Sequence, residues 1–332
     1  MNLLSQFEIL LNQSRLIFPG DKILIACSGG PDSTALLHLF RFLVPSWKLK
    51  IGVLHYDHGW RGKDSQKDAR WVEKLCANFH IPCTVGQFSA RQKKNFKKNK
   101  LSLEEAARKA RYDYFLNQAK TQRVDKLVTA HTLEDQAETI LMRIVQGTGL
   151  AGLCGIRPVV ALRGRVKVIR PMLSFSKKEI LCFLKEHHFS FRIDATNRSN
   201  RFLRNRIRSQ LIPLLEHDFN PRVVHALARV PHILGEEQEI LEGFQSDAWK
   251  KVFKKNAGGR IYLDRQIFLN FGPALQYRLL NKALQKVDVQ SGLNYRTWNE
   301  LRKALTLKRY RHSLKKDVDL FLTPSRIVLY KK

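Results

Sequence analysis

Lys22-Ile-Leu-Ile-Ala-Cys-Ser-Gly-Gly-Pro-Asp-Ser-Thr34 is the stretch that decides the fold, because it joins two kinds of pattern. The apolar run at 22–25 predicts a buried strand, and the apolar residues at 36–40 have the spacing of a helix. Gly29 and Gly30 between them let the backbone turn tightly and approach an anion, while the amides and dipole of the new helix attract negative charge. The stretch therefore predicts a strand, a turn and a helix start that bind a phosphate chain. An ordinary turn between a strand and a helix is the alternative.

This turn differs from the P-loop of kinases and GTPases. A P-loop follows its last glycine with a lysine, which reaches the outer phosphates, and with a Ser or Thr. Here no lysine follows Gly30. The sequence therefore argues against the P-loop enzymes.

The chain is long and strongly basic. Its 332 residues, 44% hydrophobic and 27% charged, are enough for two domains with a sizeable core. The net charge of +30 predicts a polyanionic partner, either nucleic acid or an anionic membrane surface. The membrane is the weaker of the two, because no apolar run approaches the roughly 20 residues of a span. The N-terminus also lacks the pattern of a secretion signal, so we expect a cytoplasmic protein.

The cysteines predict neither a disulfide framework nor a zinc site. They are odd in number and form no Cys-x-x-Cys pair. The five are Cys27, Cys76, Cys83, Cys154 and Cys182. For Cys27, at the end of the first predicted strand, we expect a packing role.

Strand and helix patterns alternate in the first part of the chain. Strands are predicted at 22–25, 49–56, 84–88 and 126–130, and helices at 3–17, 65–79, 103–119 and 133–145. This alternation predicts an α/β fold with a doubly wound parallel sheet, which we assign to residues 1–212. Ligands of such a sheet bind at the carboxyl ends of its strands.

The pattern changes near residues 207–215, beyond which helical spacing dominates. Helices are predicted at 223–241, 244–253, 273–287 and 295–307, and a β-hairpin at 318–322 and 326–330. We therefore predict that residues 213–332 form a second, smaller and mostly helical domain that ends in a β-hairpin.

Polar residues follow three of the predicted strands, in the segments 28–33, 55–61 and 131–138. Because the carboxyl ends of parallel strands share one edge, we expect these segments to lie side by side. Asp32 and Asp135 then place two carboxylates at a phosphate site, which is unfavourable unless a cation lies between them. We infer that they hold Mg²⁺, which prefers few carboxylates together with phosphate oxygens and water. Asp135 also lies three residues after Thr132, and a capping box explains it equally well.

Histidines and arginines add to the candidate site. His55, His58 and His131 follow predicted strands, and we expect at least one of the three to contact the nucleotide or an activated substrate. Arg108 and Arg111 lie on the predicted helix 103–119. Ion pairing within the helix is one explanation for these arginines, and paired hydrogen bonds to phosphate are the other.

Two basic runs, residues 91–100 and 198–208, are candidates for RNA contact. Charge runs are usually solvated, but the net charge favours RNA, and an aromatic side chain in the first run can stack on an unpaired base. In the second run, helical spacing puts three arginines on one face. We assign RNA binding to Lys93, Lys94, Phe96, Arg201, Arg204, Arg206 and Arg208.

Taken together and in order, these segments resemble those of tRNA(Ile)-lysidine synthetases, within the ATP pyrophosphatase (PP-loop) superfamily. The matching segments are Ser28-Gly-Gly-Pro-Asp-Ser33, His55-Tyr-Asp-His-Gly-Trp-Arg61, Glu105-Ala-Ala-Arg-Lys-Ala-Arg-Tyr112, Thr129-Ala-His-Thr-Leu-Glu-Asp-Gln-Ala-Glu-Thr139, Gly147-Thr-Gly-Leu-Ala-Gly-Leu153, Arg170-Pro-Met-Leu173, and Asp194-Ala-Thr-Asn197 through Arg204-Asn-Arg-Ile-Arg208. The first segment is shared by many relatives, whereas the set is specific. The chain departs from the family at His131-Thr132 and Glu134-Asp135, where two histidines and two aspartates are usual, and at Trp60, where leucine is common. Larger relatives carry a further C-terminal domain.

The resemblance implies a Rossmann-like PP-loop fold and a two-step reaction. O2 of the wobble cytidine in the CAU anticodon of tRNA(Ile) attacks the α-phosphate of ATP and expels pyrophosphate, and the ε-amine of free L-lysine then displaces AMP. The implied ATP-binding residues are Ser28, Gly29, Gly30, Pro31, Asp32, Ser33, His55, Arg108 and Arg111. Asp32 and Asp135 would bind Mg²⁺, and Asp32, His131 and Asp135 would be catalytic. His131 or a carboxylate could accept the proton of the amine, and the second domain would bind tRNA. The oligomeric state stays open, with a homodimer among the options.

Two other functions stay open. A tRNA thiolase on the same scaffold would deliver sulfur to an adenylated base, but such enzymes generally need paired reactive cysteines or a cluster site. A noncatalytic RNA-binding protein with a vestigial nucleotide loop would bind tRNA and release no pyrophosphate. Relatives that act on small substrates, such as GMP synthetase, would not need this much positive charge.

Overall fold

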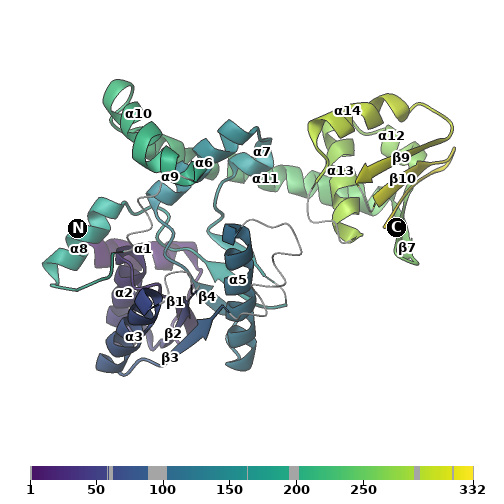
Figure 1. The fold of residues 1–332 in the computed structure, drawn as a ribbon. Coiled ribbons are helices and arrows are strands. Elements are labelled where there is room, and N and C mark those ends of the chain that lie inside the picture. Colours follow the sequence, from purple (N-terminus) through teal and green to yellow (C-terminus); the bar gives the residue numbers. More distant parts are fainter. Residues whose placement is uncertain are drawn as a thin grey trace. The chain divides into compact units, whose positions relative to one another are not determined.

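The computed structural model describes residues 2–57, 59, 63–88, 103–162, 164–193, 202–287, 292–315 and 318–331. The chain divides into two compact units, residues 1–234 and 235–332 (Figure 1). Within the described ranges, no helix combines the length and the hydropathy that crossing a bilayer requires.

A six-stranded sheet forms the centre of the first unit. Its strands are β1 (Lys22–Ala26), β2 (Lys50–Asp57), β3 (Cys83–Gln87), β4 (Lys126–Val128), β5 (Val159–Ala161) and β6 (Lys167–Ile169), in the order β3-β2-β1-β4-β6-β5. All neighbouring pairs are parallel except β5 with β6. The order reverses between β1 and β4, so the predicted doubly wound parallel sheet is confirmed.

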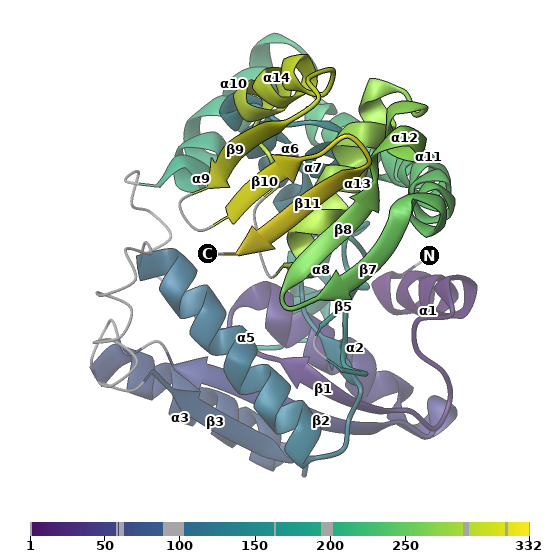
Figure 2. The same ribbon diagram turned by 90° about the vertical axis from the view of Figure 1, so that its right-hand side faces the viewer.

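Helices cover both faces of this sheet, as expected for parallel strands with continuous apolar runs. Ile23 and Ile25 of β1 face a core shared with α1 (Leu3–Ser14), α2 (Pro31–Trp47), α3 (Lys63–Asn78) and α8 (Lys177–Glu186). Leu24, between them, faces the opposite core, which α5 (Leu103–Thr121) closes with Phe115 and Ala119 (Figure 2). The alternation of one strand therefore supplies both hydrophobic layers.

The remaining helices of the first unit follow β4 and the edge of the sheet. They are α6 (Leu133–Gln146), α7 (Leu150–Leu153), α9 (Leu203–Arg206), the π-helical turn η2 (Ile207–Leu211), α10 (Ile212–Asp218) and the start of α11 (Val223–Val252).

The boundary between the compact units lies later than the predicted division at residues 212 and 213. Leu133 and Leu141 of α6 share a hydrophobic cluster with Ile212 of α10 and Val224 of α11. The start of α11 therefore packs within the first unit, and the division falls inside this helix. The predicted helices 223–241 and 244–253 are also one helix, because Gly243 does not interrupt it.

The second unit is built on a five-stranded antiparallel sheet. Its strands are β7 (Phe253–Ala257), β8 (Arg260–Asp264), β9 (Tyr310–Lys315), β10 (Val318–Leu322) and β11 (Arg326–Lys331), in the order β7-β8-β11-β10-β9. The helices are α12 (Arg265–Leu269), α13 (Pro273–Lys286), α14 (Tyr295–Ala304) and the end of α11. The predicted terminal hairpin is present as β10 and β11. The prediction of a mostly helical domain omitted β7, β8 and β9, which complete the sheet.

One buried arginine ties the loops of the second unit together. The Arg265 guanidinium is 4% exposed and donates hydrogen bonds to the main-chain carbonyls of Leu305, Leu307, Lys308 and Thr323. These carbonyls satisfy the donors of a charged group that burial would otherwise penalise. Arg265 therefore serves the structure of this unit.

Candidate nucleotide-binding site

The candidate site lies at the carboxyl ends of β1 and β4. These strands are hydrogen-bonded neighbours. The next strand after β1 in the chain, β2, lies on one side of the pair, and those that follow β4 lie on the other. A crevice opens at such a reversal because the two following segments diverge. The structure thus brings the predicted segments 28–33 and 131–138 together, and β2 ends beside them on the other side of β1.

The loop after β1 is held by its own side chains. Ser33 Oγ accepts a hydrogen bond from the Ser28 amide at 3.1 Å and donates one to the Gly30 carbonyl at 3.1 Å. Thr34 Oγ1 donates to the Gly29 carbonyl at 3.2 Å. Gly30 is the N-cap of α2 and has no side chain to cap the first amides, so the helix N-terminus stays open to an anion.

Gly29 is required by the loop geometry. Its φ of +87° lies in the left-handed region, and a Cβ added there would lie 3.3 Å from Cγ2 of Val72. The Gly29 carbonyl also accepts a hydrogen bond from the Arg192 amide at 2.8 Å, and Arg192 Nε lies 2.9 Å from Asp68 Oδ1. The loop is therefore anchored to α3 and to the segment after α8.

His55 supports this loop from the end of β2. Its Nδ1 lies 2.9 Å from the carbonyl oxygen of Cys27, which can only accept, so Nδ1 carries the proton. Burial lowers the pKa of His55 and keeps the ring neutral. Burial also raises the pKa of the Cys27 thiol to about 11, which agrees with a packing role. A contact between His55 and ATP stays a prediction.

The start of α6 carries the predicted capping box. The Thr132 amide donates to Asp135 Oδ2 at 3.0 Å, and the Asp135 amide donates to Thr132 Oγ1 at 3.4 Å. Arg204 Nη2 lies 2.9 Å from the other oxygen, Asp135 Oδ1. Burial acts to raise the pKa of Asp135, but Arg204 and the Thr132 amide outweigh it and hold the pKa below its ordinary value. The capping box is therefore confirmed, and a metal-binding role for Asp135 stays a prediction.

Glu138, one turn further along α6, is held by two arginines. Its side chain is 1% exposed, Arg204 Nε lies 2.7 Å from Oε2, and Arg208 Nε lies 2.5 Å from Oε1. The arginines of α9 and η2 therefore neutralise the acidic face of α6. Arg204 and Arg208 were predicted to contact RNA. Both pair with carboxylates here, and RNA contact by either arginine stays a prediction.

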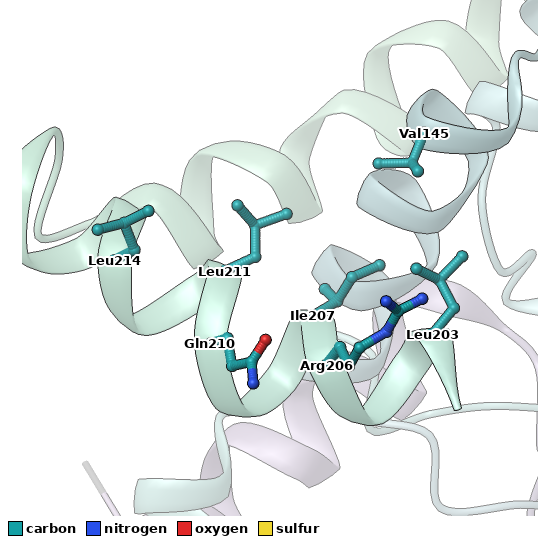
Figure 3. A pocket seen from close by; sticks show the side chains of 7 residues that line it. All are labelled: Val145, Leu203, Arg206, Ile207, Gln210, Leu211 and Leu214. Carbon is teal, nitrogen blue, oxygen red and sulfur yellow. The ribbon is translucent and has the colours of Figure 1, made fainter. Parts of the chain in front are cut away.

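Of the other predicted RNA-binding residues, the structure describes Arg206 alone. Arg206 is exposed and lines a shallow groove of about 410 Å³ between α6 and the α9–α10 segment (Figure 3). Apart from Arg206 and Gln210, this groove is apolar and is lined by Val145, Leu203, Ile207, Leu211 and Leu214. Lys93, Lys94, Phe96 and Arg201 lie outside the described residues, as does His58.

Asp32, in the first turn of α2, has the most perturbed carboxyl group of the site. The pKa of Asp32 is raised to about 6. Burial is the largest cause, the negative charges of Asp135 and Glu134 add to it, and Lys177 and Arg208 oppose it. The Lys177 amide donates to Glu134 Oε1 at 2.8 Å. In the described part of the chain, the buried Oε2 of Glu134 has no hydrogen-bond partner. The negative charge of Asp32, Glu134 and Asp135 is therefore only partly balanced by neighbouring cations and hydrogen-bond donors.

This chemistry fits a magnesium ion that is shared with a phosphate chain. Among the described residues, no three acidic, histidine or cysteine side chains come close enough to hold a metal by themselves. Mg²⁺ needs no such group, because it takes one or two carboxylates and fills its shell with phosphate oxygens and water. Asp32 beside the open N-terminus of α2, with Asp135 near it, supplies that donor set.

His131 lies in an electropositive part of the site. Its pKa is lowered to about 3. Burial is the largest cause, Asp135 opposes it, and the charges of three arginines add to it, namely Arg170, Arg108 and Arg204. Thr129 Oγ1 lies 3.0 Å from His131 Nδ1. The ligand-free protein therefore holds a neutral imidazole at neutral pH.

Arginines and one tyrosine complete this region. The guanidinium carbons of Arg108 and Arg111 lie 5.1 and 5.8 Å from the centre of the Tyr112 ring. Burial raises the pKa of Tyr112, but Arg108 and Arg170 outweigh burial and lower it. Among the described residues, the buried Nε of Arg170 lacks a hydrogen-bond partner. Such a surplus of guanidinium groups suits phosphate oxygens.

Several of these residues were not assigned to the site by the sequence analysis. Tyr112, Glu134 and Arg170 lie in the segments that carry the resemblance but received no site role there, and Lys177 lies outside those segments. One signal was available: Ser176 and Glu179 form a capping box that marks the start of α8, where Lys177 lies.

A second cavity of about 410 Å³ adjoins these carboxylates. It lies between α6, the start of α8 and the segment from η2 to α11. Its lining residues are Leu133, Glu134, Glu138, Ser176, Lys177, Lys178, Arg208, Ile212, Glu216, Pro221, Val224 and His225. The cavity combines apolar walls with charges of both signs.

Comparison with known proteins agrees with this geometry. The model of the PP-loop domain family matches residues 2–215. The chain is 32% identical over 328 residues to the tRNA(Ile)-lysidine synthase of Clostridioides difficile, which covers 96% of this chain and 70% of that protein. It is 33% identical over 287 residues to the enzyme of the same name from Thermosynechococcus vestitus, covering 86% and 79% of the two chains. This chain belongs to the tRNA(Ile)-lysidine synthase family of PP-loop proteins.

Members of the tRNA(Ile)-lysidine synthase family differ in length. The synthase of Symbiobacterium thermophilum is 35% identical over 298 residues, and this chain spans 60% of its length. Among solved structures, the U34-tRNA thiolase NcsA of Methanococcus maripaludis has a similar fold, with a TM-score of 0.59, 17% identity, and coverage of 70% of this chain and 78% of NcsA. At this identity the likeness concerns the fold alone.

Proposed function

We propose that this chain is an ATP-dependent ligase that joins L-lysine to C2 of the wobble cytidine in the CAU anticodon of tRNA(Ile). In the first step, O2 of the cytidine attacks the α-phosphate and pyrophosphate leaves. In the second, the ε-amine of lysine bonds to C2, AMP leaves and the amine gives up a proton. One observation carries the proposal: the open N-terminus of α2 and its glycine loop lie beside incompletely compensated carboxylates, in a chain of this family.

The loop and the arginines bind ATP in this proposal. The amides after Gly29 and the N-terminus of α2 receive the phosphate chain, and the rigid hydrogen bonds of Ser33 keep that geometry before ATP arrives. Arg108 and Arg111 supply further positive charge to the phosphates. Asp32 and Asp135 hold Mg²⁺, which when bound stabilises charge on the leaving pyrophosphate.

Lysine binds in the second cavity, which Glu134 lines. Its apolar walls suit the aliphatic part of the amino acid, and the buried free oxygen of Glu134 suits the ammonium group. Glu134→Gln should therefore raise KM for lysine about tenfold or more and change KM for ATP far less, because Glu134 lines the cavity and acts on Asp32 only through its charge. Steady-state kinetics measure both constants, and Glu186→Gln, an exposed change on α8, is the control. An unchanged KM for lysine would place the amino acid elsewhere.

The tRNA contacts are assigned to the basic surfaces of the chain. The net charge of +30 supports a polyanionic substrate, and we assign the second unit to tRNA binding. An anticodon base must be splayed out of its loop before O2 can reach the phosphate. His131, neutral with a pKa of about 3, is a weak base in the ligand-free protein, so a carboxylate is the better acceptor for the proton of lysine.

The test incubates the purified chain with ATP, Mg²⁺ and radiolabelled lysine. tRNA(Ile) and tRNA(Met), which share the CAU anticodon, are supplied in separate reactions. The proposal predicts label in tRNA(Ile) alone, with one pyrophosphate and one AMP for each lysine joined. Binding of tRNA without pyrophosphate release would indicate a noncatalytic protein. Pyrophosphate release that depends on a sulfur donor and not on lysine would indicate a thiolase.

A further inference from the structure

In the second unit, the described helices pack on one face of the sheet. Along its strands, alternate residues such as Ile261, Leu263, Ile327 and Leu329 enter the core that α13 and α14 close. Figure 2 looks onto the opposite face, with α13 behind the strands. The residues between those of the core therefore form an outer face within this unit.

Aromatic rings gather at the centre of this outer face. Val328 of β11 pairs with Tyr262 on β8 and with Phe321 on β10, and Tyr330 follows two residues along the same strand. The three rings therefore surround Val328 on adjacent strands, which lie about 4.8 Å apart. Phe321 is 37% exposed, and Tyr262 and Tyr330 are partly exposed.

Cationic side chains border two of the rings. Lys255 of β7 pairs with Tyr262, and its Nζ lies 5.1 Å from the centre of the ring. Arg260 of β8 pairs with Tyr330, and its guanidinium carbon lies 5.2 Å from that ring. Each ring thus has a positive charge beside it.

Two more arginines extend the positive charge. Arg311 of β9 pairs with Phe321 and has a side chain that is 64% exposed, and the exposed Arg326 precedes Val328 by two residues. The acidic side chains of this face, Asp319 and Asp264, form ion pairs within the unit. Asp319 is 2% exposed beneath Arg311 Nη2 at 2.7 Å, and Asp264 caps α12 and pairs with Lys254. The outer face therefore presents an aromatic centre with a cationic border.

We propose that this outer face binds an unpaired stretch of RNA. Bases stack on the three rings. The backbone phosphates lie against Lys255, Arg260 and Arg326, because Asp319 already compensates Arg311. The choice of RNA rests on the proposed function. It is favoured over an acidic protein or an anionic membrane because flat rings spread across a sheet match the π-faces of bases, and two of the three rings carry hydroxyl groups.

The test measures affinity of the full chain for an unmodified tRNA(Ile) transcript over a range of NaCl concentrations. Phe321→Ser removes the most exposed ring and should weaken binding by about five- to a hundredfold. Arg260→Gln with Arg326→Gln should lower the slope of log K against log salt by about 1.4 to 1.8, because each phosphate contact contributes about 0.7 to 0.9. Thermal melting shows whether each variant folds. The arginine pair keeps the test decisive should Phe321→Ser fail to fold.

The matched control is Arg296→Gln with Arg302→Gln on α14, which packs on the other side of the sheet and loses the same charge. An equal loss of slope in the control would overturn the proposal, because it would show a general effect of charge. The proposal would also be overturned if both outer-face variants bound tRNA as tightly as the wild type. It would likewise be overturned if these variants bound phosphatidylglycerol vesicles more weakly but still bound tRNA normally. Lysine transfer separates the two proposals. If the wild-type chain joins no lysine but the outer-face variants still lose tRNA, this inference stands and the proposed function fails.

Discussion

The two halves of the candidate site differ in how their charges are compensated. On the α6 side, Asp135 and Glu138 are both paired with Arg204, and Arg208 adds a second partner for Glu138. On the α2 side, Asp32 has a raised pKa of about 6, with burial as the largest cause and two neighbouring carboxylates adding to it. Asp135 and Glu138 are therefore compensated in the ligand-free protein, whereas Glu134, also on α6, keeps one buried oxygen without a hydrogen-bond partner among the described residues.

Because of this difference, we expect the carboxylates on the two sides of the site to have different functions. Glu138, which has two arginine partners, serves chiefly to position the site, and removing it leaves two partly buried cations without this partner. A buried carboxylate without a full complement of partners costs stability until a cation joins it. The α2 half is thus the place where a bound cation and ATP add most to the protein.

Substitution at Asp32 should have the largest effect. Asp32→Asn should lower Mg²⁺-dependent pyrophosphate release by about a thousandfold, because the phosphate site loses the carboxylate that faces the open helix N-terminus. Rapid-quench assays with tRNA(Ile) measure the rate. Asp113→Asn, an exposed change on α5, is the control. A rate within threefold of the wild type would remove Asp32 from the proposed site.

Glu138 should matter most for stability. Glu138→Ala should lower the free energy of unfolding of the first unit by about 4 kcal/mol, because Arg204 and Arg208 lose their shared buried partner. Urea unfolding measures the change. Arg206→Ala, at an exposed position in the same segment, should stay within about 0.5 kcal/mol of the wild type. Equal effects of the two changes would contradict the contrast between the halves.

The pH dependence of stability should sharpen the contrast. Asp32 ionises with a pKa of about 6 in the folded protein and an ordinary value of 3.8, so above pH 6 the charge is present in both states and penalises only the folded one. Asp32→Asn should therefore stabilise the ligand-free protein by at most about 3 kcal/mol at pH 7.5, and the gain should vanish below about pH 4. Unfolding curves at several pH values measure it. A gain that does not change with pH would point to packing instead.

The smallest effect should come from the loop itself. Gly29→Ala forces a Cβ into a left-handed backbone against Val72 and should cost about 1 kcal/mol while also weakening ATP binding. Gly147→Ala meets a similar φ of +75° in open space and should cost stability without affecting ATP. Calorimetric titration of ATP compares the two. Equal ATP affinities would show that the loop geometry does not hold the nucleotide.

The sequence predicts which segments meet at the edge of the sheet. It does not predict which arginine pairs with which carboxylate. Parallel strands bring their carboxyl ends to one edge, so polar residues after β1 and β4 had to meet. The capping box at Thr132 and Asp135 was local and therefore readable. Helical spacing also indicated that Arg204 and Arg208 share a face. What they face, Glu138 across some 70 residues of chain, depends on how α9 and η2 pack on α6.

The strands of the second unit are harder to predict from the sequence. β10 and β11 form a hairpin, which local pattern reveals. β7, with the residues Phe253-Lys-Lys-Asn-Ala257, lacks the alternation of a half-buried strand because four of its five residues are exposed. β8 and β9 lie in the sheet next to strands from distant parts of the chain. The outer face emerges only when the register is known, because its rings come from three strands.

We propose above all that the loop after β1 binds the triphosphate of ATP and that the bond between the α- and β-phosphates is cleaved. The most direct measurement follows ATP labelled at the γ-phosphate in the presence of the chain, Mg²⁺, lysine and tRNA(Ile). The account predicts that the label appears in pyrophosphate, with AMP as the other product, and that Asp32→Asn abolishes this release. Label in orthophosphate, with ADP as the other product, would contradict it.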